Sequence, residues 1–296
     1  MKTALYSTLY PAITPYLEPF FNSIDRQSDQ DFDLCLSLDG FDEKLLEPFL
    51  NREAHCIPAK GDTIASMRER ALLEICKSYD AVILVDSDDI LLPNRVKRGR
   101  EALKTYDAYA CALELIDETA TPLNLTFQAN RVSSWESYLS RVNVFGFSNA
   151  AYRADVLAAC FPIARETVMV DWLVASQVLA QNHSLYFDAE PQMLYRQYGA
   201  NTARVISPFT AEQITRACLL VLGHYDYLLD LFKTRAPQNE LFQEELIKRQ
   251  RGVKRFFEFM QDEAKLRAYT EKINYLKATY SWWEMVAHPD LESLWQ

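Results

Sequence analysis

The sequence lacks a long apolar segment. No stretch of its 296 residues approaches the roughly 20 apolar residues that a membrane-spanning helix requires. Met1-Lys2-Thr3 leads directly into a candidate strand, and the apolar run there is too short for a secretory signal peptide. Internal repeats and low-complexity segments are also missing. These absences favour a cytoplasmic protein without a membrane span.

Paired cysteines are missing as well. The six cysteines are scattered, no two of them form a C-x-x-C pair, and most have apolar neighbours: Cys35, Cys56, Cys76, Cys111, Cys160 and Cys218. The four histidines lie too far apart in the sequence to suggest a cluster. This distribution favours reduced, buried thiols over a disulfide framework or a zinc site.

Positive charge is in deficit. The chain has 31 Lys and Arg against 41 Asp and Glu, a net charge of −10, which argues against a nucleic-acid-binding surface. Residues 1–206 contain 19 basic and 28 acidic residues, whereas residues 207–296 contain 12 and 13, so the excess acid lies in the first part. Hydrophobic residues make up 49% and charged residues 24%, which is typical of a soluble globular protein.

One acidic stretch, residues 81–93, organises the rest of the chain in our interpretation. It reads A-V-I-L-V-D-S-D-D-I-L-L-P, in which a short apolar run suits a strand buried on both faces and Asp86, Asp88 and Asp89 follow at once. These crowded carboxylates repel one another, and a hard cation such as Mg²⁺ or Mn²⁺ would relieve the repulsion. A solvated acidic turn that caps the next helix is the alternative. The buried strand directly before the acids favours the cation site.

Strands and helices alternate along residues 1–206. The apolar periodicity predicts strands at 4–9, 30–38, 54–57, 81–85, 108–114, 184–187 and 192–195, helices at 15–23, 43–50, 64–77, 94–105, 135–139, 154–160 and 170–181, and a loop or hairpin at 117–128. This alternation predicts an α/β fold with a mostly parallel sheet covered by helices. Three strands end in Thr8–Pro11, in Asp39-Gly40 and in Asp86–Asp89. We expect these residues to meet at one edge of the sheet, where such folds bind ligands.

The character of the sequence changes after Pro208. Residues 209–233, 240–260 and 263–280 are rich in Leu, Phe and Tyr at helical intervals and predict three long helices. We therefore divide the chain into a domain of residues 1–206 and a helical extension of residues 207–296. The basic residues of 248–255 could meet an anionic surface such as a membrane. We favour the alternative, in which an apolar stripe packs on the core and the charges are solvated; the stripe is Phe242, Leu246, Val253, Phe256 and Met260.

Seven motifs occur in order between residues 3 and 206. They are the first strand with its loop Thr8–Pro11, Leu38–Gly40, Ile64–Arg68, Val85–Pro93, Phe147–Arg153, Val170–Trp172 and Tyr195–Thr202. In this order and spacing, the chain resembles the family 2 glycosyltransferases, which are nucleotide-sugar-dependent enzymes with a GT-A-type fold. The resemblance implies a Rossmann-like domain over residues 1–206, to which the C-terminal helices are an extension.

The resemblance also implies roles for individual residues. Asp39 would contact the nucleotide base, and Arg68 would help to hold the donor. Of the D-x-D pair, Asp86 would contact the ribose and Asp88 the divalent metal, while Asp171 would be the catalytic base. Further residues implied at the donor site are Thr8, Tyr10, Pro11 and Ser87, and additional candidates are Asp89, Arg196, Tyr198 and Asn201.

Two positions depart from the family pattern. Val170 stands where the family often has a Glu before the catalytic Asp, so one carboxylate is missing. Tyr198 stands where the family segment often has a His, which puts a contact of that side chain with the metal or the diphosphate in doubt. Both departures keep a non-catalytic alternative open.

Without the resemblance, several candidates have a simpler interpretation. Asp39 is typical of a turn residue before Gly, and Asp171 is typical of a helix N-cap. Arg68 could pair with a glutamate of its own helix. Arg196 and Asn201 could stabilise a loop.

We expect a cytoplasmic, inverting, metal-dependent glycosyltransferase that uses a nucleotide-sugar, with UDP as the favoured nucleotide, to build a surface polysaccharide or another glycoconjugate. Mn²⁺ or Mg²⁺ on Asp88 would neutralise the diphosphate leaving group, and Asp171 would deprotonate the acceptor hydroxyl. One alternative is a degenerate transferase that serves as a binding or scaffold protein. Another is a sugar nucleotidyltransferase, although Thr8–Pro11 is not the Gly-rich phosphate loop usual in that class.

The expected partners are a nucleotide-sugar donor and a glycan or glycoconjugate acceptor, and no nucleic acid. A peripheral contact with the inner face of the membrane and a homodimer stay open. Trp282, Trp283 and Trp295 could serve a dimer contact or close the acceptor side.

Overall fold

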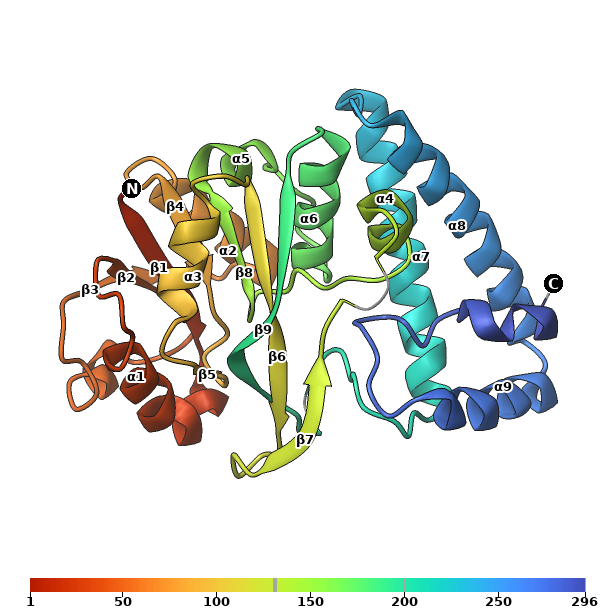
Figure 1. Ribbon diagram of the computed structural model, residues 1–296, viewed down its shortest axis with the longest axis horizontal. Coiled ribbons are helices and arrows are strands. Elements are labelled where there is room, and N and C mark those ends of the chain that lie inside the picture. The colour runs from red at the N-terminus through yellow and green to blue at the C-terminus, as the bar shows by residue number, and fades with distance from the viewer. Residues whose placement is uncertain (130–131, 200, 296) are drawn as a thin grey trace.

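A single sheet crosses the molecule and is flanked by helices (Figure 1). The computed structural model describes residues 1–129, 132–199 and 201–295. Within these ranges, nine strands form the sheet in the order β3-β2-β1-β4-β8-β6-β9-β5, and β7 pairs with β6 off this path. The α/β fold class predicted from the sequence is confirmed.

Four parallel strands form one half of the sheet: β1 (Thr3–Leu9), β2 (Asp33–Leu38), β3 (Ala54–Pro58) and β4 (Ala81–Leu84). β1 lies between β2 and β4, with Tyr6 opposite Cys35 on one side and Leu84 on the other. β4 is wholly buried and β1 nearly so, because their side chains are apolar on both faces. The carboxyl ends of β1, β2 and β4 therefore lie side by side at one edge, as the sequence predicts.

Helices and short turns connect these strands: η1 (Pro11–Tyr16), α1 (Leu17–Asp25), η2 (Glu43–Leu46), α2 (Ile64–Ile75) and α3 (Arg95–Ala102). α2 begins at Ile64 because the Thr63 hydroxyl accepts a hydrogen bond from the Ser66 backbone N–H at 3.3 Å. The prediction of a helix at residues 43–50 is wrong in length, because the single turn η2 forms there. Leu46 is the one buried residue of this turn, so little apolar burial stabilises a longer helix there.

The second half of the sheet is mixed: β5 (Ile90–Leu91), β6 (Ala108–Ile116), β7 (Pro122–Phe127), β8 (Ala150–Arg153) and β9 (Leu185–Arg196). β8 joins the halves by pairing antiparallel with β4 and β6, and β6 runs parallel to β9. The sequence predicts two strands at residues 184–187 and 192–195, but they form one continuous strand. A register shift between Cys111 and Leu113 of β6 absorbs the irregular residues between them, which include Pro191.

Helix α6 (Val170–Ala180) lies inside the molecule. Asp171 is half-buried and every other residue of α6 is buried, as expected for a helix that is almost wholly apolar. α4 (Trp135–Leu139) and α5 (Ala154–Ala159) contact it. The one acidic residue of α6 thus stands in its first turn, where the helix dipole favours a negative charge.

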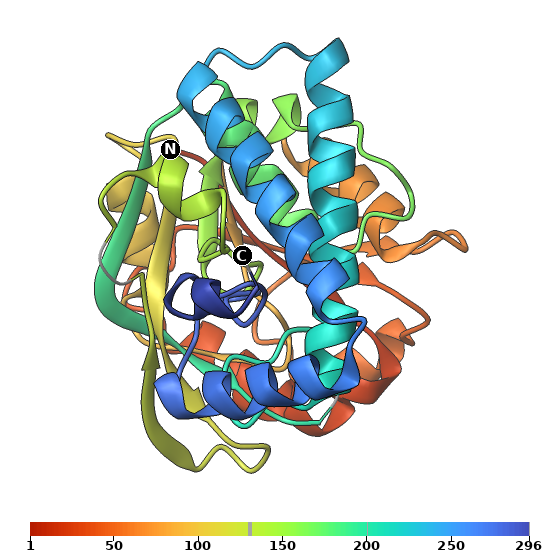
Figure 2. The ribbon, with the colours of Figure 1, turned by 90° about the vertical axis from the view of Figure 1, so that its right-hand side faces the viewer.

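The C-terminal part contains the three long helices that the sequence predicts: α7 (Ala211–Thr234), α8 (Glu240–Phe259) and α9 (Glu263–Leu276). α7 and α8 run side by side next to α6, and α9 crosses below them (Figures 1 and 2). The apolar stripe of Phe242, Leu246, Val253, Phe256 and Met260 is buried. Exposed basic residues on the same helix are Lys248, Arg251, Lys254 and Arg255. The structure therefore supports packing of the stripe on the core.

After α9 the chain turns back toward the sheet and ends in η3 (Pro289–Leu294). Trp282, Trp283 and Trp295 are each 5% exposed, so none of them lies on an open surface. Trp282 packs against Phe127 of β7 with ring centroids 4.2 Å apart. The hydrophobic core is one cluster that includes residues of the sheet and of the C-terminal helices. The division of the chain at residue 206 stays a prediction.

Two further observations concern the environment of the chain. All six cysteines are free thiols, four of them buried and two half-buried. In the part of the chain that the structure describes, no helix is long and apolar enough to cross a membrane.

Candidate active site

The acidic cluster begins where β4 leaves the core. The Val85 backbone N–H donates to the Tyr6 carbonyl at 3.0 Å, which extends the β1–β4 pairing to the edge of the sheet. The Ser87 hydroxyl then donates to the Thr8 carbonyl at 2.7 Å. These bonds tie the cluster to the end of β1, and they place Asp86 beyond the strand, as the sequence predicts.

Asp86 is held by two other segments of the chain. Its Oδ2 accepts a hydrogen bond from the Ser148 hydroxyl at 2.9 Å, and its Oδ1 lies 3.5 Å from Nη2 of Arg68. The Arg68 guanidinium stacks over the Phe147 ring, 4.0 Å from its centroid, which fixes its position. Arg68 of α2 therefore pairs across the site, not with a glutamate of its own helix.

Asp88 faces two tyrosines. The Tyr198 hydroxyl donates to Oδ2 of Asp88 at 2.7 Å, and Tyr10 shares a hydrogen bond with Tyr198. Burial, followed by the charge of Asp86, raises the pKa of Asp88 above its ordinary value. Burial and the nearby Asp88 also raise the pKa of Tyr10 to about 12, so this phenol stays neutral.

Asp89 and Arg196 support the cluster from behind. Asp89 is 1% exposed, and its Oδ1 accepts from the Arg196 backbone N–H at 2.8 Å. Burial and the charge of Asp88 raise the pKa of Asp89 well above its ordinary value. The Arg196 guanidinium donates to three backbone carbonyls, those of Asp88, Asp117 and Glu118. The Arg196 side chain therefore holds the loops around the site together, which agrees with the simpler interpretation of Arg196 as a loop-stabilising residue.

Asn201 has a similar bracing contact. Its Oδ1 accepts from the Tyr198 backbone N–H at 2.6 Å, and its Nδ2 donates to the Arg196 carbonyl at 3.2 Å. These bonds hold the turn that presents the Tyr198 hydroxyl to the acidic cluster. Ala200, within the same motif, lies outside the described residues.

The ends of β1 and β2 form the other wall of the site. The Asp39 backbone N–H donates to the Leu9 carbonyl at 2.8 Å, and its side chain is half-exposed beyond β2. Gly40 follows with a φ of +65°, a conformation that favours glycine. Pro11 is exposed at the start of η1, and the Thr8 hydroxyl lies 3.3 Å from the Tyr6 hydroxyl.

Asp171 stands in the first turn of α6, within electrostatic range of Arg68 and Asp86. Its Oδ1 accepts from the Trp172 backbone N–H at 2.8 Å, and its Oδ2 accepts from Nδ2 of Asn143 at 3.0 Å. Burial raises the pKa of Asp171 to about 6. The positive charge of Arg68 opposes this rise, and the negative charge of Asp86 adds to it. A carboxyl group with this pKa can exchange a proton near neutral pH.

The described residues contain no cluster of three His, Cys, Asp or Glu that could hold a metal by themselves. Mg²⁺ and similar cations are commonly bound by one or two carboxylates together with substrate phosphates. Asp88 fits that kind of site, because a bound cation would stabilise its charged form against burial and the repulsion from Asp86, which raise its pKa. The Tyr198 hydroxyl donates a hydrogen bond to one of the two carboxylate oxygens of Asp88.

Two contacts of the site were not foreseen from the sequence. Ser148 lies in a motif of the resemblance but had no assigned role, and it bonds Asp86. Asn143 donates a hydrogen bond to Asp171. The one sequence feature that could have indicated this role is its place as a polar residue in the otherwise apolar run V-N-V-F-G-F.

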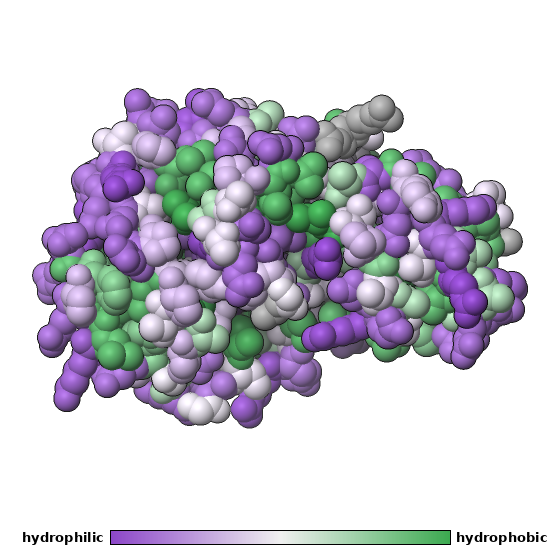
Figure 3. Space-filling model, turned by 90° about the horizontal axis from the view of Figure 1, so that it is seen from below, coloured by the Kyte–Doolittle hydropathy of each residue, from purple (hydrophilic) through white to green (hydrophobic). Residues whose placement is uncertain are grey.

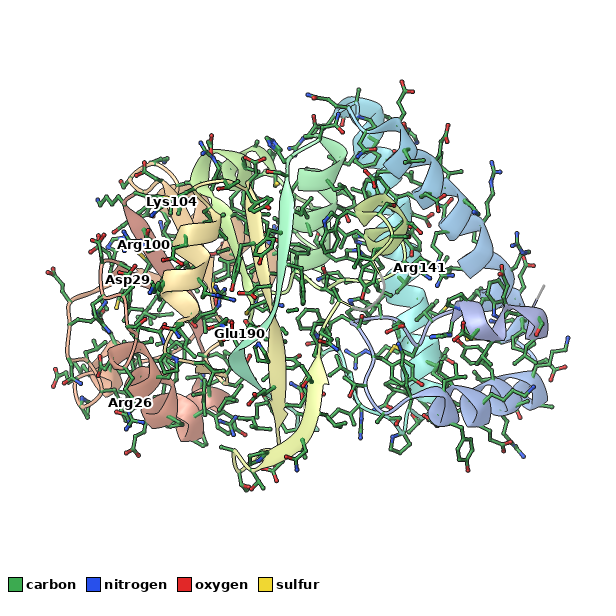
Figure 4. The ribbon with its side chains drawn as sticks, viewed as in Figure 1. Arg26, Asp29, Arg100, Lys104, Arg141 and Glu190 are labelled. Carbon is green, nitrogen blue, oxygen red and sulfur yellow. The ribbon has the colours of Figure 1, made fainter. Side chains whose placement is uncertain are left out.

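An open region lies near the amino ends of β1 and β2, away from the acidic cluster. A hollow of about 590 Å³ is lined by Met1 and by residues of the chain before β2 and of α3. Figure 4 shows Asp29, Arg100 and Lys104 there, near the N-terminal end of the chain. Arg100 donates to both carboxylate oxygens of Asp29, and it also pairs with Asp31. Three basic side chains (Lys97, Arg100 and Lys104) and three acidic ones (Asp29, Asp31 and Glu101) line the hollow, so its side chains offer no excess charge for a ligand.

Seen from below, the surface of the molecule carries hydrophilic and hydrophobic residues in separate patches (Figure 3).

Comparison with known proteins identifies the class to which this fold belongs. Neither a protein-family model nor a curated protein sequence matches the chain. Solved structures do match it, and they show that the chain has the GT-A-type fold of glycosyltransferases.

Three of these structures can be named. TarS 1-349 of S. aureus in complex with UDP-GlcNAc has a TM-score of 0.53 and 13% identity over 99% of this chain and 91% of that chain. Mannosyltransferase PcManGT from Pyrobaculum calidifontis in complex with GDP-Man and Mn²⁺ has a TM-score of 0.55 and 11% identity over 92% and 73%. A longer TarS structure from S. aureus has a TM-score of 0.55 and 15% identity over 84% of this chain, and the match spans 43% of that protein. At these identities the likeness establishes the fold alone.

Proposed function

We propose that this protein is an inverting glycosyltransferase that moves a sugar from a nucleotide-sugar donor, a UDP-sugar, to a hydroxyl of a glycan or glycoconjugate. One observation carries the proposal: two carboxylates in different environments, Asp86 and Asp171, lie within electrostatic range of each other. Asp86 is held by a guanidinium and a hydroxyl, while Asp171 is desolvated and has a pKa of about 6. The GT-A-type fold supports the proposal, as do the nucleotide-sugars in two of the similar structures.

The donor side is assigned to the strand ends. Asp39 would contact the nucleotide base, and Asp86 would contact the ribose. The stacking of the Arg68 guanidinium on Phe147 would hold its positive charge where the donor diphosphate would lie. Thr8, Tyr10, Pro11 and Ser87 would line the rest of the donor pocket.

Asp88 is the residue that we assign to a divalent metal, Mn²⁺ or Mg²⁺. Such a metal, when bound, would act as a Lewis acid that stabilises the diphosphate leaving group. The chain contributes the Asp88 carboxylate, which Tyr198 orients through one oxygen, and Arg196 holds the backbone of the same residue. Mn²⁺ is present with GDP-Man in one of the similar structures, which supports a metal-assisted reaction.

Asp171 is the group that we assign as the general base. With a pKa of about 6 it is mostly ionised at pH 7 and can still accept a proton. The acceptor oxygen attacks the anomeric carbon as the bond to the diphosphate breaks, and Asp171 takes the hydroxyl proton. Because attack comes from the face opposite the leaving group, this single displacement inverts the anomeric carbon.

The first test of this function is nucleotide binding. Thermal unfolding is measured with UDP, GDP and dTDP, each with and without Mn²⁺, and we expect a metal-dependent rise in the melting temperature that is largest for UDP. UDP-GlcNAc and GDP-mannose then serve as trial donors, and NMR of the product should show an inverted anomeric configuration. Retained configuration would contradict the single displacement. No metal-dependent response to any of the nucleotides would favour the degenerate binding protein instead.

We also propose a cytoplasmic location. Its support is the set of six free thiols, which suits a reducing compartment. Fluorescence of a tagged copy in fractionated cells would test this, and recovery outside the cytoplasm would contradict it.

A further inference from the structure

A buried amide links the candidate base to the C-terminal segment. Asn143 has no exposed surface, and its Nδ2 donates to Oδ2 of Asp171 at 3.0 Å and to the Phe145 carbonyl at 3.2 Å. Its Oδ1 accepts from the Phe145 backbone N–H at 2.9 Å. The Asn143 backbone N–H donates to the Trp282 carbonyl at 3.2 Å. A single residue thus touches both the base and the chain that returns from α9.

These bonds allow the amide only one orientation. The Phe145 N–H needs an acceptor, so the amide oxygen must face it and the amide nitrogen must face Asp171. A donor at this place favours the ionised form of Asp171 and opposes the effect of burial. The other charged or titratable groups that act on Asp171 are Arg68 of α2, Asp86 beyond β4 and the Tyr152 hydroxyl of β8.

The carboxylate of Asp171 is held at two points. The Trp172 backbone N–H donates to Oδ1, and Nδ2 of Asn143 donates to Oδ2. The first contact comes from the next residue of α6 and moves with the helix, whereas the second comes from a different segment. Among the hydrogen bonds of the described residues, the Asn143 bond is therefore the one that ties the carboxylate to a segment outside α6.

The C-terminal segment is packed tightly against the same loop. A Cβ added to Gly146 would lie 2.5 Å from the Trp282 ring, so the ring fills the space that only glycine leaves. The Trp282 Nε1 donates to the Tyr195 hydroxyl at 3.2 Å, which fixes the indole from the other side. The position of Trp282 is therefore transmitted to Asn143 through both the loop and the backbone bond.

We propose that Asn143 is a positioning residue that aims the Asp171 carboxylate and makes its geometry depend on the C-terminal segment around Trp282. The role of Asp171 in transfer rests on the proposed function. The hydrogen bond itself can be measured whether or not that function is correct, because the titration of Asp171 requires no substrate.

The test follows the Asp171 carboxyl carbon by NMR in protein labelled with ¹³C at aspartate, with Asp171→Asn identifying the signal by its loss. In Asn143→Ala, we expect the titration midpoint to rise by on the order of one pH unit, because the charged form loses its donor. Gln27→Ala is the matched control: Gln27 is a buried amide outside this loop that donates to the carbonyls of Ser23 and Leu92 and accepts from the Val96 backbone N–H, and it does not bond Asp171. Its midpoint should not move, although both variants lose stability.

Two more variants keep the test open if Asn143→Ala folds poorly. Asn143→Asp has nearly the same shape but faces Asp171 with an acceptor, so its midpoint should rise further. Gly146→Ala displaces the Trp282 ring, and we expect a smaller rise in the midpoint together with a lower kcat. Asn143→Asp leaves the donor-side residues Arg68, Asp86 and Asp88 unchanged, so UDP titrated with Mn²⁺ should bind this variant as it binds the unmodified protein.

The outcomes separate this inference from the proposed function. If the Asn143 variants leave the Asp171 midpoint and kcat unchanged while Asp171→Asn abolishes transfer, the positioning role is wrong and the function stands. If Asp171→Asn transfers sugar normally but Asn143→Ala still moves the midpoint, the contact is real and the assignment of the base is wrong. If Gly146→Ala changes neither quantity, the coupling to the C-terminal segment is overturned.

Discussion

Asp86, Asp88 and Asp89 are adjacent in sequence but have different partners. Asp86 accepts a hydrogen bond from a hydroxyl and pairs with a guanidinium. Asp88 accepts a hydrogen bond from a phenol, and Asp89 accepts one from a backbone N–H. The Oδ2 of Asp89 is buried without a hydrogen-bond partner among the described residues. Because a carboxylate's chemistry depends on its partners, replacing each of the three should have a different effect.

Replacing Asp88 by Ala is expected to abolish metal-dependent donor binding and to leave the fold intact. A cation at a diphosphate contributes several kcal/mol, so the affinity for UDP in the presence of Mn²⁺ should fall by more than about 100-fold. Calorimetric titration with UDP, with and without Mn²⁺, measures this. The control is Asp42→Ala, at an exposed turn outside the site. Unchanged binding of UDP and Mn²⁺ by Asp88→Ala would remove Asp88 from the metal site.

Replacing Asp171 by Asn is expected to slow transfer by about 10²–10⁴-fold while UDP binding is kept, because only the proton acceptor is lost. In the unmodified protein the rate should fall as the pH drops through about 6, where Asp171 becomes protonated. The pH profile of kcat for the two proteins measures both effects. A kcat of the unmodified protein that does not fall below pH 6 would contradict the assignment of Asp171 as the base.

The same residue also has a predictable effect on stability. Its pKa in the folded chain, about 6, is above the ordinary 3.8, so between these values the folded chain keeps a proton that the unfolded chain has lost. Stability should therefore fall as the pH rises through this window, and Asp171→Asn should be more stable than the unmodified protein at pH 7 by up to about 3 kcal/mol. Urea unfolding at pH 4 and pH 7 tests the sign, and a less stable variant at pH 7 would contradict it.

Among the elements, α8 shows most clearly how an amphipathic sequence determines packing. Its buried apolar residues recur at helical spacing and most of its acidic and basic residues lie on the other side, so one side is buried and the other is exposed. Phe256 has no exposed surface and lies against Tyr269 of α9, with ring centroids 4.6 Å apart, and near Trp295. This ring therefore joins α8, α9 and the last residues of the chain.

Phe256→Ala is expected to reduce the free energy of unfolding by about 3–5 kcal/mol, because it removes a buried ring and leaves a cavity. Arg255→Ala, at the adjacent exposed position, should change it by less than about 0.5 kcal/mol. Urea unfolding followed by circular dichroism measures both values. Equal effects of the two substitutions would mean that the stripe does not pack on the core in solution.

The whole molecule has one continuous core, although its sequence changes character after Pro208. α8 contacts α4 and α6, and Trp282 contacts Phe127 of β7, so the C-terminal part covers surfaces of the sheet domain. The candidate base lies on α6, the helix that this cover buries. The C-terminal part thus contributes to the environment that raises the pKa of Asp171.

A fragment of residues 1–206 is therefore expected to lose more than about 5 kcal/mol of stability, which is comparable with the total for a domain. It should bind the dye ANS, because the buried face of α6 becomes exposed. The control is the full chain with a protease site inserted at residue 207, cut after folding, whose two pieces should stay together on a sizing column. A fragment that unfolds as cooperatively as the full chain would show that the predicted domain boundary separates independent units.

Much of the site could be predicted from the sequence, because it depends on local patterns. The buried β4 run followed by Asp86 and Asp88 indicates a strand end, and parallel strands place their carboxyl ends at one edge. Arg68 and Asp171 were located by the order of motifs, and the structure brings both within electrostatic reach of Asp86. Their roles in donor binding and catalysis stay predictions.

The remaining features depended on tertiary contacts between residues far apart in the chain. Strand alternation and helical spacing are repeated within a few residues, so they can be recognised without knowing the fold. The Asn143 bond to Asp171, the fit of Trp282 over Gly146 and the Arg196 brace each join segments separated by many residues. No local pattern specifies such pairs, because only the packed sheet and helices decide which distant groups meet. The sequence thus determined where the acids lie, and the tertiary structure decided which partner each of them has.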